Sequence, residues 1–300
     1  MHRVHRAQTK GSSLARQGMS DLAIRNWFII PTIAFLIVFN IFPLLYSLGF
    51  SFTDYRAASN RPAHFIGLEN YQELLTDDGI WNNFTITAKY VIISVAGQVI
   101  VGFGLALLLN RPIRGKGLLT TILLLPMMMS AAVVGLFWQL LYNPSWGIVN
   151  YLLGLEKMEW LSNPDVALYA IAITDIWMWS PFVMLLCLAG LSAIPSSLYE
   201  AAAIDRAPPW FVFRRITLPL VAPLLLIAII FRTMEAFKTF DIAFIMASLE
   251  ETELVSIRLY KLAFQEWQTG RSCALAYIVL LAVLAITTIY IKYLNRLKER

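Results

Sequence analysis

The chain has 300 residues, of which 58% are hydrophobic and only 14% are charged, and its mean hydropathy is +0.65. A soluble domain of this length would carry about a quarter charged residues, so the composition argues against a soluble protein and indicates one that lies in a membrane. The net charge of +5 is modest, and no polar segment carries a basic stripe with interleaved aromatic residues, which argues against nucleic-acid binding. The two cysteines, Cys187 and Cys273, lack metal-ligand spacing and are expected to be small apolar packing residues.

Six segments are apolar enough, over about 20 residues each, to cross a membrane as helices. In chain order these are Trp27–Phe50, Ile86–Leu109, Leu118–Leu141, Val166–Leu191, Pro219–Ala247 and Ala274–Leu294. The first is too long for a signal-peptide core, so we expect an uncleaved span after a polar, basic tail over residues 1–26. The sequence therefore predicts an all-α polytopic membrane protein, with a transmembrane domain over residues 27–294 and a short tail over 295–300.

The Lys and Arg residues of the connections and tails are distributed unevenly. Both tails, the connection between the second and third spans, and the connection between the fourth and fifth spans together carry fifteen, if Lys292 at the end of the sixth span is counted with the C-terminal tail. The other three connections carry six. Since Lys and Arg concentrate in cytoplasmic loops, we predict that both termini are cytoplasmic. The connection before the fifth span would then be cytoplasmic as well.

That connection, residues 197–218, reads "SLYEAAAIDRAPPWFVFRRITL" and predicts two short helices. Ser197 and Glu200 have the spacing of a capping box at the start of a helix over Leu198–Asp205. Pro208 ends this helix, and Pro209 can begin a second one over Trp210–Leu218, which Pro219 is expected to end. From the residues alone, two interpretations are about equally supported: an amphipathic connection lying in the headgroup region, or a partner surface whose small alanines allow close approach.

The pattern in this connection resembles the EAA loop of permease subunits in bacterial ABC importers. The matching residues are Glu200, Ala201, Ala202, Asp205, Ala207, Trp210, Phe213, Ile216, Leu218 and Pro219. In that family the loop is a coupling helix that sits in a groove of the ATP-hydrolysing subunit. The family usually has glycine where Arg206 stands, and an arginine can adopt the left-handed backbone of such a turn only at some cost.

The resemblance extends over about residues 28–294 and is to carbohydrate-type permeases, such as those for maltose and glycerol 3-phosphate. It is carried by "FIGLENYQELL", by "LLNRPIRGKGLLTTILLLPMMMS", and by "DIWMWSPF" and "FKTFDIAFIM". It implies a type I importer permease fold in the bacterial inner membrane. It also implies a second permease subunit, two ATP-binding subunits that hold ATP and magnesium, and a solute-binding protein. The chain departs from many relatives by lacking a "GGP" turn after the fifth span.

Charged and aromatic residues inside the fourth and fifth spans are candidates for a solute path. The fifth span carries Arg232, Glu235, Lys238 and Asp241, which alternate in sign at three-residue spacing. Such residues can pair along one helix as a structural ladder, or they can line a path for a polyhydroxylated solute. In the fourth span Asp175, Trp179 and Phe182 share one helix face, which suits a sugar, whereas Trp177 points away from Trp179. These aromatics can equally be lipid-facing or partner-facing packing residues.

An enzyme is a poor interpretation of this sequence. The histidines are His2, His5 and His64, none of which lies in a span, and the segment "RGKG" lacks the other residues of a phosphate-binding loop. A chain of this kind would depend on a partner to hydrolyse ATP. The alternative is a secondary transporter that is driven by an ion gradient through the charges of the fifth span.

Overall fold

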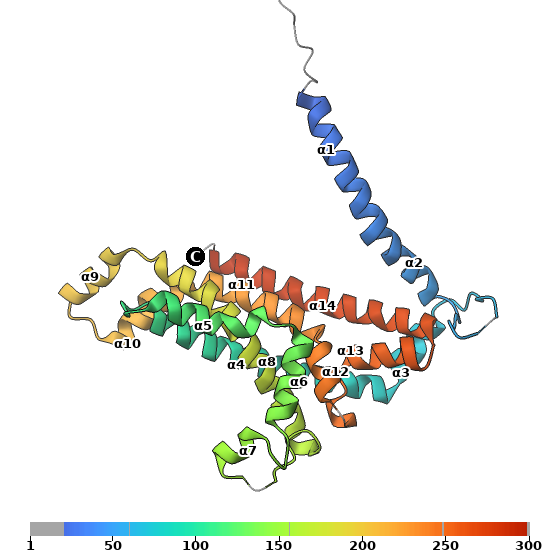
Figure 1. Cartoon of the computed structure of the whole chain (residues 1–300). Coiled ribbons are helices and arrows are strands. Elements are labelled where there is room, and N and C mark those ends of the chain that lie inside the picture. Colours follow the sequence, from blue (N-terminus) through green and yellow to red (C-terminus); the bar gives the residue numbers. More distant parts are fainter. Residues whose placement is uncertain (1–20, 60, 156, 248, 299–300) are drawn as a thin grey trace, which may run out of the picture. The chain divides into compact units, whose positions relative to one another are not determined.

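The computed structural model describes residues 21–59, 61–155, 157–247 and 249–298, and its elements in this part of the chain are helices (Figure 1). One isolated bridge, between Thr53 and Phe65, is the only β-type pairing among these residues. The chain divides into two units, one through Gly49 and one from Phe50 onward. This confirms the all-α expectation for the described residues.

The first unit contains one apolar helical path. It consists of α1 (Asp21–Leu36), a π-helical turn (Ile37–Ile41) and most of α2 (Phe42–Ser51). The span over Asn26–Ser51 has no residue of its most apolar window buried in the protein, and Trp27 is 74% exposed. A helix that is apolar all round needs apolar surroundings, as the hydrocarbon region of a membrane supplies.

The second unit holds the remaining helices. They are α3 (Glu69–Thr76), α4 (Asp78–Leu109), α5 (Lys116–Met128), α6 (Ala131–Leu141), α7 (Ile148–Leu153), α8 (Pro164–Ser192), α9 (Ser196–Ile204), α10 (Pro209–Val212), α11 (Leu218–Phe237), α12 (Asp241–Met246), α13 (Val255–Tyr260) and α14 (Thr269–Lys298). The longest of them, α4, α8, α11 and α14, lie side by side (Figure 1). Among the described residues, five helices are long and apolar enough to cross a membrane, or six if one bent pair is a single span.

The bent pair corrects the prediction of a straight third span over Leu118–Leu141. Helices α5 and α6 meet at an angle of 96°, with Ser130 in an extended conformation between them. Pro126 lies in the last turn of α5, where its ring removes one backbone hydrogen bond and crowds the carbonyl of Ile122. The Ser130 carbonyl then accepts the first backbone bond of α6, from Val134 at 3.0 Å.

The fifth span was also predicted wrongly at both ends. The helical path begins at Pro209 and ends at Phe237, because α10 continues into α11 through a π-helical turn over Phe213–Thr217. Pro219 was expected to end a helix, but it lies at the start of α11. Its missing N–H costs little stability there, because the preceding turn is a wider π-helical one. After Phe237 the N–H groups of Lys238 and Thr239 bond back only three residues, which closes the helix before α12 begins at Asp241.

The core of the second unit lies along the contact between α4 and α8, with α11 against both. Gly102 of α4 permits this close approach, because a Cβ there would lie 2.5 Å from the Ser180 carbonyl oxygen and 2.7 Å from Val183 Cβ. Small residues at helix contacts are typical of membrane bundles. Cys187 is buried in this region and Cys273 is half-buried, and both are free thiols.

Candidate functional site

A buried polar network joins three spanning helices inside this core. Gln98 of α4 lies between Asp175 of α8 and Arg232 of α11. Its Nε2 donates to Asp175 Oδ2 at 2.7 Å, and its Oε1 accepts from Arg232 Nε at 2.8 Å. Arg232 Nη2 also lies 3.6 Å from Asp175 Oδ1. With exposed fractions of 3% for Arg232 and 1% for Asp175, the two charges depend on each other and on the amide between them.

Arg232 also packs against an aromatic ring. The guanidinium carbon of Arg232 lies 4.4 Å from the centre of the Trp179 ring, which is cation–π geometry. Trp179 follows Asp175 by one helical turn, so the carboxylate and the indole meet the arginine from the same face of α8. The network therefore places an indole beside fixed hydrogen-bonding groups.

A pocket of about 220 Å³ opens onto this network, and we call it the α8–α11 pocket. It is lined by Ala131, Asp175, Trp179, Arg232, Glu235, Lys238, Thr239, Phe240, Asp241 and Ile242. Six of the seven residues predicted for a solute path are in this set. The exception is Phe182, whose ring packs edge-on against Phe231 at 6.4 Å. Trp177 points elsewhere, as expected, and packs against Trp138.

The ladder of charges along one helix, one of the two interpretations of these residues, forms only in part. Lys238 Nζ donates to Glu235 Oε1 at 2.7 Å, as three-residue spacing allows. Arg232, however, pairs across to Asp175 on α8, and Asp241 belongs to a separate helix, α12. The break after Phe237 is the cause, because it carries Asp241 out of the helical register.

Gln98 was missed by reasoning from the sequence. The signal that could have found it is an uncharged amide in the middle of an apolar span, since such a group needs a partner at bilayer depth. Tyr90 and Ser94 of α4 also lie beside Asp175, with Tyr90 Oη, Ser94 Oγ and Asp175 Oδ1 all buried. The polar surroundings of Asp175 thus extend beyond Gln98 and Arg232.

The connection between α8 and α11 forms a helical hairpin that we call the α9–α10 hairpin (residues 196–217). Glu200, Ala201, Asp205 and Arg206 are exposed, whereas Ala202 is buried. A shallow groove of about 500 Å³ runs along the hairpin. Its lining includes Ala201, Ala202, Asp205, Arg206 and Ala207 from the predicted set. The other members of that set, Glu200, Phe213, Leu218 and Pro219, lie outside the groove.

Three contacts fix the shape of this hairpin. The Tyr199 and Thr217 hydroxyls lie 3.2 Å apart and join its two limbs, and the Phe213 ring stacks on Trp210 and contacts Phe103 of α4. The predicted capping box is wrong: α9 begins at Ser196, two residues before the predicted start at Leu198, and no side chain caps it. Ser197 therefore lies within the first turn of the helix instead of at its cap.

The turn of the hairpin depends on Arg206. This residue has φ of +50°, the left-handed conformation expected at the position where the family usually has glycine. The Arg206 N–H bonds to the Ala203 carbonyl at 3.1 Å, and the Ala207 N–H bonds to the Ala202 carbonyl at 2.9 Å. This is the Schellman pattern that ends many helices. The exposed arginine thus occupies a position that strongly favours glycine.

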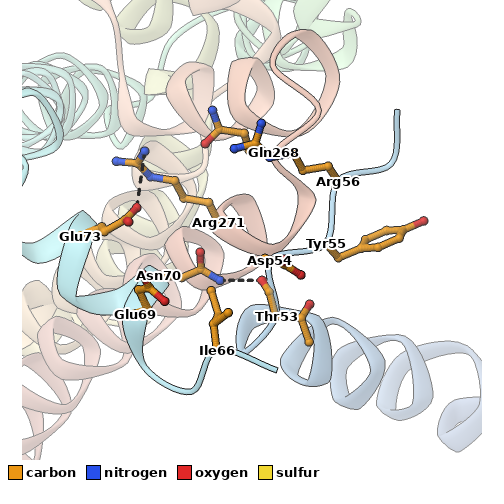
Figure 2. Close-up of a pocket in the computed structure, with 10 residues that line it drawn as sticks. All are labelled: Thr53, Asp54, Tyr55, Arg56, Ile66, Glu69, Asn70, Glu73, Gln268 and Arg271. Carbon is orange, nitrogen blue, oxygen red and sulfur yellow. Dashed lines mark hydrogen bonds and ion pairs between the residues drawn. The ribbon is translucent and has the colours of Figure 1, made fainter. Parts of the chain in front are cut away.

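A second polar pocket, of about 300 Å³, lies where α3, the loop before it and the start of α14 meet (Figure 2). Arg271 lies 3.0 Å from Asp77 and 3.9 Å from Glu73, and Asn70 Nδ2 donates to the carbonyls of Ser51 and Thr53 at 2.9 Å. Gly270 lets the two backbones meet, and its N–H donates to the Tyr55 carbonyl. None of these residues was predicted as a site.

An all-helical membrane protein with a polar, aromatic pocket among its spans and an exposed small-residue hairpin between two of them has the architecture of a transporter subunit. Residues 98–299 match the family described as binding-protein-dependent transport system inner membrane component. The chain belongs to this family. It is therefore the membrane permease subunit of an importer.

The relatives support the same class over nearly the whole chain. The trehalose/maltose transport system permease protein MalF of Thermococcus litoralis is 34% identical, with 88% of this chain and 91% of that protein covered. The sulfoquinovosyl glycerol transport system permease protein SmoG of Agrobacterium fabrum is also 34% identical, with 88% and 86% covered. A bacterial ABC transporter that imports the acidic polysaccharide alginate has the same fold, with a TM-score of 0.79, 22% identity, and 91% and 96% of the two chains covered.

These findings decide between the classes that the sequence left open. The chain has the type I importer permease fold, it is a component of an ATP-driven ABC transporter, and it is a transport subunit instead of an enzyme. No finding supports the ion-gradient alternative. The hydrolysis of ATP belongs to partner subunits in importers of this kind.

Proposed function

We propose that this chain forms part of the path by which a sugar, polyol or related polar solute crosses the bacterial cytoplasmic membrane. The α8–α11 pocket carries the proposal. It sets the Trp179 ring beside Asp175 and Arg232, so a sugar could stack its C–H face on the indole while its hydroxyls meet charged groups. The trehalose, maltose and sulfoquinovosyl glycerol systems named among the relatives support this class of solute.

The α9–α10 hairpin is the proposed contact with an ATP-hydrolysing subunit. Its groove is lined by alanines, which let another backbone approach closely, and the charges of Glu200, Asp205 and Arg206 lie exposed around it. Exposed Trp210, at 67%, and Phe211, at 50%, add apolar surface of the kind that interfaces bury. In this arrangement ATP and magnesium are held by the partner, and closure of the partner moves the hairpin and rocks the spans between inward-facing and outward-facing states.

The remaining partners and the orientation complete the proposal. Both termini and the hairpin lie in the cytoplasm, which the distribution of Lys and Arg supports. A second, different permease subunit pairs with this chain, two ATP-binding subunits bind on the cytoplasmic side, and a solute-binding protein delivers the solute. An alginate importer in complex with its solute-bound periplasmic protein has the same fold, with a TM-score of 0.78, and supports the last of these partners.

Purification of the chain from its native membrane in mild detergent tests the proposal. We expect an ATPase with a phosphate-binding loop and a second polytopic permease to accompany it. Glu200→Lys should release the ATPase and abolish transport while the two permeases remain together, because it inverts a charge beside the proposed docking groove. Glu159→Lys, an exposed glutamate far along the chain from the hairpin, is the control and should retain the ATPase. A chain that purifies alone and moves solute without ATP would overturn the proposal.

A further inference from the structure

The α8–α11 pocket has an unequal number of positive and negative side chains. Its lining contains three carboxylates, from Asp175, Glu235 and Asp241, and two cations, from Arg232 and Lys238. By formal count the lining of this chain therefore carries one more acidic than basic side chain. The net charge of a pocket favours the binding of solutes of opposite charge and disfavours the binding of solutes of like charge.

Both cations are already engaged. The buried Arg232 guanidinium is held by Gln98 and Asp175, and turning it toward a solute would leave the buried Asp175 without its partner. Lys238 Nζ lies 2.7 Å from Glu235 Oε1, so an anion that approached this ammonium group would also meet the Glu235 carboxylate. Arg232 is therefore not free to receive a negatively charged solute, and the exposed Lys238 offers its charge only together with that of Glu235.

Asp241 is the unmatched charge. Its side chain is exposed, and no hydrogen bond or ion pair joins its carboxylate to any other residue that the structure describes. It stands in the first turn of α12, next to the break that ends α11, and it lines the same pocket as Trp179. A solute held against Trp179 is therefore in the field of this carboxylate.

We infer that the α8–α11 pocket selects neutral or cationic sugars and polyols over those that carry a carboxylate, sulfonate or phosphate, and that Asp241 is the specificity-determining residue. Two like charges about 5 Å apart, in the effective dielectric of a protein surface, disfavour binding by about a hundredfold. The fold does not decide this charge class, since the importer of an acidic polysaccharide shares it. The inference rests on the proposed function, because it assumes that solute passes through this pocket.

The charge of the pocket can be measured without knowing the solute. In the complete importer, Ala131→Cys places a thiol in the pocket lining, in a background of Cys187→Ala and Cys273→Ala. The thiol is reacted with a cationic and with an anionic methanethiosulfonate of similar size, and each reaction is followed as an increase in the mass of this chain. Each rate is then divided by the rate at which the same reagent reacts with free cysteine. We expect the cationic reagent to be favoured by about tenfold, and Asp241→Asn to remove most of that preference.

The controls separate pocket charge from general accessibility. Ser145→Cys, on the loop after α6, should show no dependence on Asp241, and Thr239→Cys serves as a second reporter within the pocket. A purely structural role for Asp241 at the start of α12 would slow or speed both reagents together. An anionic reagent that reacts as fast as the cationic one, or a preference unchanged by Asp241→Asn, would overturn the inference.

The imported solute provides the second test. Uptake by the complete importer, assayed with panels of neutral sugars, polyols, uronates and sugar phosphates, should identify an uncharged or cationic solute. An acidic solute would overturn the inference and leave the proposed function standing. Failure of the proposed function would instead appear as the loss of ATP dependence, whichever solute is moved.

Discussion

At the scale of single residues, the buried pair of Asp175 and Arg232 is the most consequential feature of the molecule. Two ionised groups inside a membrane bundle are expensive, and Gln98 satisfies one hydrogen bond of each. The net contribution of the pair to the free energy of unfolding is therefore smaller than the loss of stability that follows when one partner is removed. It does fix where the Trp179 indole lies.

Arg232→Ala should destabilise the permease by about 3–5 kcal/mol, because it leaves the Asp175 carboxylate buried without its partner. The double variant Asp175→Leu, Arg232→Met replaces both charges with apolar groups of similar size and should recover most of the loss. Thermal unfolding of the purified complex measures both. Transport should remain impaired in the double variant, since the solute path has lost its polar groups. A stable Arg232→Ala protein would show that the pair is not interdependent.

Arg206 is the second residue whose environment makes a sharp prediction. Its left-handed backbone, with φ of +50°, disfavours any side chain and β-branched ones most of all. Arg206→Gly should stabilise the turn by about 1 kcal/mol, and Arg206→Val should weaken it by a similar amount or more. Hydrogen exchange at the amides of Arg206 and Ala207, which close the turn, reports the change. Equal protection in both variants would contradict the structure of this turn.

At the scale of helices, the contact between α4 and α8 depends on a backbone approach that only glycine permits. A Cβ at Gly102 would meet the backbone of Ser180 and Met184 within 3.0 Å, whereas Gly104, two residues on, has nothing within 4 Å of its Cβ position. Because backbone atoms of a packed helix cannot move aside cheaply, the two glycines have very different tolerances.

Gly102→Ala should therefore destabilise the permease by about 1–3 kcal/mol and reduce its yield in the membrane. Gly104→Ala is the matched control and should be neutral or slightly stabilising, since alanine is the better helix former. Thermal unfolding of the two variants in the same detergent gives the comparison. Equal effects would show that α4 and α8 do not meet as closely at Gly102 as the structure places them.

The fifth span is a place where a prediction from helical periodicity fails. This span was predicted as one helix through Ala247, so its four charges could either pair as a ladder or line one path. The chain instead leaves the helix after Phe237 and starts α12 at Asp241. No proline or glycine marks that break, so its signal is not in local propensity. It depends on tertiary packing, in which Ile242 and Ala243 of α12 are buried in the main core.

At the scale of the whole molecule, the class of protein follows from few properties. The low share of charged residues and the six apolar segments predict a polytopic helical membrane protein, and the pattern around Glu200 predicts an importer permease. The first prediction depends on the bilayer, which admits helices of a narrow range of lengths, and the second depends on a local motif. Composition is sufficient for the first, whereas the second depends on the resemblance of that motif to a known family. The fold class and the family were accordingly correct.

The site required more than local pattern. The sequence could name Asp175, Trp179 and Arg232 as candidates, because charged and aromatic groups inside spans are few. It could not pair Arg232 with Asp175 in place of Glu235, bring in Gln98, or exclude Phe182. Those assignments depend on how α4, α8 and α11 rotate against one another.

Local chemistry in the chain was thus enough to establish a membrane bundle, its approximate spans and the hairpin, whereas the left-handed turn at Arg206 was left open by the sequence and is seen only in the structure. The three-dimensional packing alone decided the 96° bend of the third span, the break before Asp241, and the network that gathers Gln98, Asp175 and Arg232 around one pocket. The physical reason is that hydrophobic burial and backbone preference act over a few residues. The pairing of buried charges is decided only where distant helices meet.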